Sequence, residues 1–324
     1  MVGEMFSLKD EKIACLQETN TQPHPDVFTP QKDIFYGLYF RKDEHSTGQL
    51  PTGSYPFFGN NLQAPQPSTA DQQPIPKWFV LKPQPRKKNE VLHPAKYPED
   101  LVEMFIGRFT RPGQTVFDPM SGTGSTQLGA LRLGRYGFGT ELSEFFAGIA
   151  IERLNAYCQL ANANYPLFRI TQKDARLITA DDTPPIDYLL TSPPYWDMLN
   201  MKGAENQAKR IEKGLQTNYS DTAEDLGNLA DYHAFVDELV SIYLNLADLM
   251  NPGSYATIVV KNIKKKGRNY PFAWDLALAL QQRLILLPEV FWCQDDLSIA
   301  PYGYGNTWVS NTFHQYCLNF QKPY

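Results

Sequence analysis

Hydrophobic residues follow two alternating patterns from residue 99 onward. Short apolar runs are typical of buried strands, and longer segments with apolar residues at helical spacing are typical of amphipathic helices. The strand-like runs lie at 114–120, 136–142, 166–175, 186–194, 254–263, 287–294 and 313–322. The helix-like segments lie at 99–109, 125–134, 144–161, 229–250 and 272–283, and Asn251-Pro252-Gly253 ends the fourth of them with a stop signal.

This alternation predicts an α/β fold in which a mostly parallel sheet carries helices on both faces. The last two strand-like runs, 287–294 and 313–322, have no helical segment between them. We therefore expect one of these two strands to run antiparallel to the others.

Residues 1–90 have a different composition, rich in Gln, Asn, Thr and Pro, but they keep many aromatic residues. A disordered tail rarely retains so many aromatic side chains. We predict an ordered but irregular N-terminal extension that wraps the core. Residues 91–324 are then the main domain, with 200–230 as a polar insert.

Overall composition is that of an ordinary globular protein, with 42% hydrophobic and 20% charged residues. The sequence has no apolar run near the length of about 18 residues that a membrane span needs, and its start lacks the pattern of a secretory signal. Cys15, Cys158, Cys293 and Cys317 form no C-x-x-C pair, so we expect neither a metal site nor a disulfide framework. These features predict a cytoplasmic protein without a membrane partner.

Net charge is −5, which does not by itself indicate a nucleic-acid partner. Positive charge is nevertheless concentrated in two short clusters, at 86–88 and 261–268. Each cluster is either a solvated surface or a set of phosphate contacts.

Acidic residues end three successive predicted strands. Asp118 ends the first and leads into a turn with Gly122 and Gly124, Glu141 ends the second, and Asp174 follows the third. In open α/β sheets, ligands bind beyond the carboxyl ends of the strands. Glycines let the backbone approach a ligand closely, and an acid after the next strand is suited to ribose hydroxyls.

Two nucleotide-like ligands compete for this arrangement. A nicotinamide dinucleotide site wants a third glycine and a helix N-terminus facing pyrophosphate, but position 127 is Gln127 and Asp118 would repel phosphates. An acid suits a ligand that carries an ammonium and a sulfonium group. We therefore interpret the site as one for S-adenosylmethionine.

The fourth predicted strand runs into Ser192-Pro193-Pro194-Tyr195-Trp196, in which a rigid diproline holds two aromatic residues at the end of a strand. Taken together, "DPMSGTGST" (118–126) and "TSPPYW" (191–196) resemble the amino-group DNA methyltransferases, which methylate cytosine N4 or adenine N6. Further segments, "HPAKYPEDLVEMFI" (93–106), "KNIKKKGRNYPFAWDLA" (261–277) and "HQYCLNFQK" (314–322), are similar to segments of that family. The resemblance covers roughly residues 91–323.

The resemblance implies a Rossmann-like fold with a mostly parallel seven-stranded sheet and a final antiparallel strand. It implies S-adenosyl-L-methionine as cofactor, no metal, and double-stranded DNA as substrate. The implied cofactor-binding residues are His93, Asp118, Pro119, Ser121, Gly122, Thr123, Gly124, Glu141, Leu142, Asp174 and Ala175. His93 has an alternative interpretation, as a cap of the following helix.

The loop Ser192, Pro193, Pro194 and Tyr195 is the implied catalytic element. An exocyclic amine conjugated to its ring is a poor nucleophile, so it needs acceptors that pull on its N–H bonds. Ser192 Oγ and the Pro193 carbonyl are candidate acceptors, and preorganised acceptors do not have to rearrange during the reaction. Tyr195 offers a face on which a flipped-out base can stack.

The N-terminal extension (1–90) is a candidate for DNA contact, and the insert at 200–230 is a candidate DNA-recognition element. The predicted DNA-binding residues come from the basic clusters and the catalytic loop. They are Arg86, Lys87, Lys88, Trp196, Lys264, Lys265, Lys266 and Arg268. The lysines and arginines would neutralise phosphates, and Trp196 is either a second wall of the base pocket or a packing residue.

Serine at the first position of the catalytic loop is, in this family, commoner in enzymes that modify cytosine N4, so we predict that base. Adenine N6 is the alternative, followed by an RNA amino-methyltransferase and by an inactive cofactor-binding regulatory subunit. A monomer or homodimer is expected, and a cognate restriction endonuclease would act separately.

Overall fold

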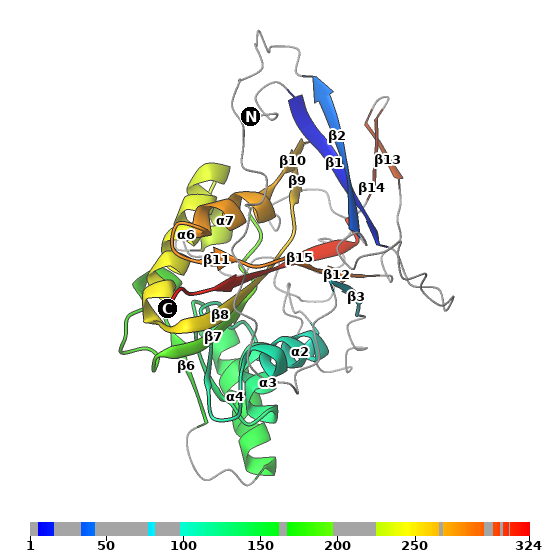
Figure 1. Cartoon of the computed structure of the whole chain (residues 1–324). Helices are drawn as coiled ribbons and strands as arrows, with labels where there is room; N and C mark the ends of the chain where they lie inside the picture. Colours follow the sequence, from blue (N-terminus) through cyan, green and yellow to red (C-terminus); the bar gives the residue numbers. More distant parts are fainter. Residues whose placement is uncertain are drawn as a thin grey trace, which may run out of the picture.

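A mostly parallel, twisted sheet runs through the computed structural model, with helices packed on both of its faces (Figure 1). The structure describes residues 6–15, 34–42, 77–81, 98–161, 167–196, 225–265, 268–294, 301–304, 307–310 and 312–324. Among these residues, no helix is long and apolar enough to cross a membrane.

Strand order in the sheet is β3-β12-β15-β8-β7-β4-β5-β6, with the short β11 paired to β15. The strands are β3 (Trp78–Val80), β4 (Thr115–Asp118), β5 (Tyr136–Glu141), β6 (Phe168–Gln172), β7 (Ile186–Thr191), β8 (Met250–Val260), β11 (Ile285–Leu286), β12 (Val290–Cys293) and β15 (His314–Gln321). Strands β6, β5, β4, β7 and β8 are mutually parallel, and β15 runs antiparallel between β8 and β12. The predicted α/β class and the final antiparallel strand are thus confirmed.

Two strands extend the seven that the sequence predicts. Strand β3 adds parallel to β12 at one edge of the sheet, and β11 pairs antiparallel with the end of β15. Both are only two or three residues long. Such short segments carry too few alternating positions to be recognised as strands from a hydrophobic pattern.

Side chains of the central strands alternate between two layers of helices, because successive residues of a strand point to opposite faces. On one face, Val116 and Tyr188 pack against the layer of α2, α3 and α4; on the other, Phe117 and Leu189 pack against α6 and α7. The helices are α2 (Glu99–Phe109), α3 (Ser125–Arg132), α4 (Glu144–Leu160), α6 (Tyr232–Leu249) and α7 (Phe272–Leu280). Figure 1 shows the two layers on opposite sides of the sheet.

A buried chain of hydrogen bonds crosses three neighbouring strands of the sheet. The Tyr188 hydroxyl of β7 donates to Thr257 Oγ1 of β8 at 2.6 Å, and the Thr257 hydroxyl donates to Asn319 Oδ1 of β15 at 2.7 Å. Buried polar groups that are satisfied in this way fix the register of their strands. The carboxyl ends of β7 and β8 are consequently held at one level.

Three hairpins gather at the edge of the sheet where the parallel strands end (Figure 1). The hairpin of β9 (Ile263–Lys265) and β10 (Arg268–Tyr270) follows β8, and that of β13 (Pro301–Tyr304) and β14 (Thr307–Ser310) lies between β12 and β15. The third, β1 (Phe6–Cys15) with β2 (Ile34–Lys42), contacts β10 and β14. All three therefore lie at the carboxyl edge.

The N-terminal hairpin differs from the irregular extension that the sequence predicts for residues 1–90. Strands β1 and β2 are ten and nine residues long and pair antiparallel from Phe6 opposite Lys42 to Cys15 opposite Ile34. Antiparallel pairing across a connection of this length is set by tertiary contacts, which composition does not report. The predicted insert at 200–230 lies largely outside the described residues.

Candidate functional site

The predicted site residues follow the carboxyl ends of four adjacent strands. Strand β4 lies between β7 and β5, and β6 lies beyond β5. Asp118 ends β4, Glu141 ends β5, Asp174 follows β6 and Ser192 follows β7. The fold therefore brings together residues that are up to 74 positions apart in the sequence, from Asp118 to Ser192. Residues 118–124 are called the glycine loop below, and residues 192–195 the diproline loop.

Asp118 organises the turn from β4 into α3. Its side chain is 1% exposed, and Oδ1 accepts the Met120 N–H at 3.0 Å while Oδ2 accepts the Thr126 hydroxyl at 2.7 Å. Both bonds are made to a charged acceptor, which strengthens them. Asp118 therefore holds the glycine loop in place through hydrogen bonds to a backbone N–H of the loop and to a hydroxyl of α3.

Glycines are required at two positions of the glycine loop. Gly122 has φ of 53° and Gly124 has φ of 76°, values that side-chain-bearing residues rarely adopt. A Cβ atom on Gly124 would also lie 3.1 Å from Ala150 Cβ in α4. The loop can therefore adopt this path, close to α4, only because both residues are glycine.

Glu141 closes the glycine loop from the neighbouring strand. Its Oε2 accepts the Gly122 N–H at 2.7 Å, and its Oε1 accepts the Ser143 N–H at 2.9 Å. Burial raises the pKa of Glu141; the two backbone hydrogen bonds oppose this rise, and the charges of Asp118 and Asp225 add to it. Negative charge thus accumulates here, which favours a cationic ligand.

Gln127 occupies the position where a dinucleotide fingerprint would have glycine. It is fully buried, and its side-chain amide donates to Ser121 Oγ at 2.9 Å and to the Phe138 carbonyl at 3.0 Å. The Ser121 hydroxyl donates in turn to the Asp118 carbonyl at 3.0 Å. Ser121 therefore makes its hydrogen bonds inside the loop, and its partner Gln127 is the residue whose presence argued in the sequence against a dinucleotide site.

The remaining predicted residues near this loop have varied surroundings. The Pro119 carbonyl accepts the Thr140 hydroxyl at 2.7 Å, and Leu142 is half-buried. Ala175 is buried at the start of the short helix η2 (Ala175–Leu177). His93 lies outside the described residues.

Asp174 is paired with a neighbouring arginine. Its Oδ2 accepts from Arg176 Nη2 at 2.6 Å, and Oδ1 accepts the Arg176 backbone N–H at 2.9 Å. Burial would raise the pKa of Asp174, but the hydrogen bonds and the charge of Arg176 bring it below its ordinary value. An adenine amino group would therefore share this carboxylate with Arg176.

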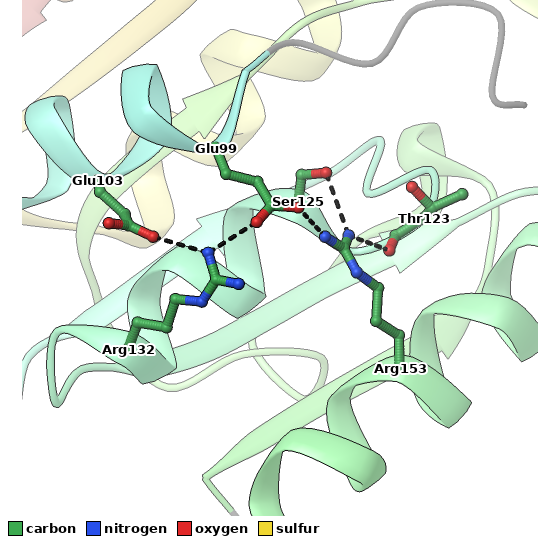
Figure 2. A network of polar contacts seen from close by, with 6 residues as sticks. All are labelled: Glu99, Glu103, Thr123, Ser125, Arg132 and Arg153. Atoms are coloured by element: carbon green, nitrogen blue, oxygen red, sulfur yellow. Dashed lines mark hydrogen bonds and ion pairs between the residues drawn. The ribbon is translucent and has the colours of Figure 1, made fainter. Parts of the chain in front are cut away.

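A network of polar contacts holds the glycine loop against α2 and α4 (Figure 2). Glu99 of α2 accepts from Arg132 and from Arg153, and Arg132 also donates to Glu103 at 2.9 Å. Arg153 alone reaches the loop, where it donates to the Thr123 carbonyl at 3.1 Å, and it also donates to Ser125 Oγ at 3.3 Å. The two arginines share one glutamate, but only Arg153 supports the loop.

Replacing Arg153 with methionine is expected to weaken binding of S-adenosylmethionine about three- to tenfold. The substitution keeps an apolar stem but removes a charged hydrogen bond to the Thr123 carbonyl in a partly exposed network, where such bonds contribute modestly. Arg132→Met is the matched control, since it also loses a bond to Glu99 but touches no loop atom. Equal cofactor dissociation constants for the two variants, measured by calorimetry, would contradict this role.

The diproline loop leaves β7 beside the glycine loop. Pro193 is buried, and Ser192, Pro194 and Tyr195 are half-buried. The Tyr195 hydroxyl lies 3.4 Å from Gln315 Oε1 at the start of β15, and burial raises the pKa of Tyr195 to about 12. Its phenol therefore keeps its proton at physiological pH.

A short helical turn, η3 (Leu226–Asn228), supports the diproline loop. Asp225, 5% exposed, caps this turn by accepting the Gly227 N–H at 2.9 Å. A Cβ atom on Gly227 would lie 3.3 Å from the Tyr195 carbonyl oxygen and 3.8 Å from Pro194 Cβ. Neither Asp225 nor Gly227 was among the residues predicted from the sequence, where their only signal is a D-x-G turn before a helix.

Gly227→Ala is expected to lower the rate of the reaction about tenfold without weakening cofactor binding. The added methyl group would lie 3.2 Å from Asp225 Oδ1 and 3.3 Å from the Tyr195 carbonyl oxygen, so both must shift by a few tenths of an ångström, and small displacements of reacting groups reduce rates strongly. Gly148→Ala in α4 is the control, because its Cβ would meet no atom within 4 Å. Identical turnover numbers for the two variants would show that η3 does not support the loop.

Trp196 lies in the hydrophobic core. It is 4% exposed, its indole N–H donates to the Leu229 carbonyl at 2.8 Å, and its ring packs edge-on against Tyr232 and Tyr270. These are the surroundings of a packing residue, the second of the two interpretations of Trp196 given above.

Of the predicted phosphate-binding residues, three are described. Lys264 and Lys265 are half-buried on β9, and Arg268 is exposed on β10. Arg86, Lys87, Lys88 and Lys266 lie outside the described residues. The β9–β10 hairpin therefore carries positive charge at the carboxyl edge of the sheet, directly after β8.

Comparison with known proteins supports the predicted resemblance. Residues 4–152 match the family described as DNA methylase, of the N6/N4 type. This range begins within the N-terminal extension, contains the glycine loop and ends before the diproline loop.

Two related proteins match over shorter stretches. Type II methyltransferase M.BglII from Bacillus subtilis is 32% identical over 89 residues, which are 28% of this chain and 24% of that protein. Orphan methyltransferase M.BamHII from Bacillus amyloliquefaciens is 44% identical over 66 residues, 20% of this chain and 24% of that protein. The chain spans about a quarter of the length of the curated relatives it matches. These matches confirm the resemblance to the amino-group DNA methyltransferases.

Among solved structures, TrmN from Thermus thermophilus aligns with a TM-score of 0.42 and 15% identity, covering 69% of this chain and 48% of that chain.

Proposed function

We propose that this chain is an S-adenosylmethionine-dependent DNA methyltransferase that modifies an exocyclic amine, with cytosine N4 as its target. One observation carries the proposal. Strands β4 and β7 pair directly, with Val116 opposite Tyr188, so the acidic glycine loop and the diproline loop leave the sheet next to each other. A cofactor site and an amine-activating loop would thus share one edge.

The glycine loop fits the cofactor chemically. Asp118 and Glu141 supply negative charge, which favours a ligand that carries a sulfonium and an ammonium group. Glu141 uses one lone pair of each oxygen on a backbone N–H, which leaves acceptor capacity for ribose hydroxyls. When bound, the cofactor supplies an electrophilic methyl group.

The diproline loop would prepare the amine. Ser192 Oγ and the Pro193 carbonyl would each accept a hydrogen bond from one N–H group of the amine, so that electron density on the nitrogen becomes available for attack. Neither proline has an N–H of its own, and each fixes its φ angle, which keeps the acceptors in place. Tyr195 would stack on the target base and recover part of the unstacking free energy, at roughly 1–3 kcal/mol.

The carboxyl edge is also the expected DNA-binding face. Hairpins β1–β2, β9–β10 and β13–β14 surround it, and Lys264, Lys265 and Arg268 add positive charge to one of them. Contacts from these side chains to phosphates would position the duplex without reading its sequence. The relatives named above include both a type II and an orphan methyltransferase, so a cognate endonuclease acting separately stays a prediction.

The proposal is tested by transfer of a labelled methyl group from S-adenosylmethionine to unmethylated mixed-sequence DNA, with a structured RNA as the competing substrate. Incorporation into DNA that exceeds incorporation into RNA at least tenfold is expected. Label in RNA alone would assign the chain to RNA amino-methyltransferases. Cofactor binding without transfer to either nucleic acid would indicate a regulatory subunit.

A further inference from the structure

Two lysines, Lys261 directly after β8 and Lys265 at the end of β9, face the aromatic residues Tyr195 and Trp196. Lys261 Nζ lies 5.6 Å from the centroid of the Tyr195 ring, and Lys265 Nζ lies 3.7 Å from the centroid of the Trp196 ring. Both distances are within the range of cation–π interactions. Each of the two consecutive aromatic residues therefore contacts a lysine of the basic cluster at 261–268. The sequence suggested phosphate contacts or a solvated surface for this cluster.

The contact between Lys261 and Tyr195 follows from the order of the sheet. Strand β8 pairs with β7 on one side and with β15 on the other. The residue that follows β8, Lys261, therefore lies beside the loop that follows β7, and Gln315 at the start of β15 contacts the Tyr195 hydroxyl. Tyr195 is thus contacted by Lys261, which follows the neighbouring strand β8, and by Gln315 of β15, the strand beyond β8.

Keeping a charge at Lys261 has an energetic cost. Burial lowers the pKa of Lys261, and the nearby charge of Lys264 lowers it further. The electron-rich face of an aromatic ring compensates part of the lost hydration of an ammonium group. The contact with the Tyr195 ring therefore offsets part of the free-energy cost of keeping Lys261 charged.

We propose that Lys261 is a positioning residue that holds the Tyr195 ring by one face, so that the target base stacks on the opposite face. This inference rests on the proposed function, in which Tyr195 receives the base. A ring has two faces, and an ammonium over one of them excludes a base from that side. Lys261 therefore determines both the tilt of the ring and the side from which the base enters.

The test compares Lys261→Met and Lys261→Arg in the full chain. Methionine keeps an apolar stem of similar length and removes the charge, whereas arginine keeps a charge that can lie over a ring. Lys77→Met is the control, because Lys77 precedes β3, and the strands β12 and β15 separate β3 from β8 in the sheet. K261M is expected to lower kcat for DNA methylation about five- to thirtyfold with an unchanged KM for the cofactor, and K261R should recover most of the loss.

Amide hydrogen exchange of the peptide that spans Tyr195 provides a second readout, independent of methyl transfer. Exchange should become faster in K261M, but not in K261R or K77M, while melting temperature confirms that each variant is folded. Unchanged kcat and exchange in K261M would overturn the proposal, as would an arginine variant that behaves like the methionine variant. If the wild-type chain does not methylate DNA, the proposed function fails, and the exchange rates still decide whether Lys261 holds the loop.

Discussion

Ser192→Ala is expected to lower kcat for methyl transfer about 10²- to 10³-fold, the largest effect of any single change considered. Ser192 Oγ is one of two candidate acceptors for the target amine, and removing one preorganised hydrogen-bonding group from a reacting centre typically has an effect of this size. The cofactor dissociation constant should stay within about twofold, because the glycine loop is supported by Asp118, Glu141 and Gln127 instead.

The experiment measures single-turnover methylation at saturating cofactor together with cofactor binding by calorimetry. Ser241→Ala is the matched control. Ser241 is exposed on α6, and α6 covers the face of the sheet opposite to α2, α3 and α4. A full rate in the Ser192 variant would remove the loop from catalysis. A parallel loss of rate and of cofactor binding would show that Ser192 is structural.

Glu141→Gln is expected to weaken cofactor binding about 10- to 100-fold. The carboxylate accepts two backbone N–H groups, from Gly122 and Ser143, and a glutamine amide would turn its NH₂ group toward one of those donors. The substitution also removes a negative charge from a buried site that would hold a cationic ligand. Glu144→Gln is the control, because Glu144 is exposed at the start of α4.

The raised pKa of Glu141 gives this prediction a pH dependence of defined sign. Burial is the largest cause of the rise from 4.5, with Asp118 and Asp225 adding to it. Cofactor affinity depends on the ionised form, so it should be greatest above this pKa and fall as the pH drops through it. The Gln variant should lack this dependence. Affinity that does not change between neutral pH and the ordinary pKa of the carboxyl would contradict the assignment.

Stability of the ligand-free protein should change in the opposite direction. Because the folded state holds the Glu141 proton more tightly than the unfolded state, this residue's contribution to unfolding free energy increases as the pH falls from above its folded pKa toward 4.5. The pKa values of Asp174 and Asp182 are lowered from 3.8, so the stability that these two carboxylates contribute is lost only at a lower pH. The difference between wild type and Glu141→Gln isolates the effect.

Much of the fold was accessible from the sequence because local patterns determined it. The strands β4 to β8, β12 and β15 and the five helices coincide with the predicted segments, and the missing helix between β12 and β15 correctly predicted an antiparallel strand. Glycine positions were equally informative, since Gly122 and Gly124 both adopt positive φ angles.

What the sequence did not provide depends on contacts between distant segments. Lys261 looked like part of a charge run, and its contact with Tyr195 exists only because β8 lies next to β7. The charge of Asp225 raises the pKa of Glu141 although more than eighty residues separate the two in the sequence. Neither relation leaves a periodic or compositional signal. The Asp174–Arg176 pair is local, but it depends on side-chain conformations that residue types do not specify.

The most direct test of the account is to identify the methylated nucleoside. Purified protein is incubated with isotopically labelled S-adenosylmethionine and unmethylated DNA, the DNA is digested, and labelled nucleosides are identified by mass spectrometry. We predict label in N4-methylcytosine, formed about 10²- to 10³-fold more slowly by the Ser192→Ala variant. Label in N6-methyladenine would retain the amine chemistry and overturn the choice of base. Label on a ring carbon, or none in DNA, would contradict the account.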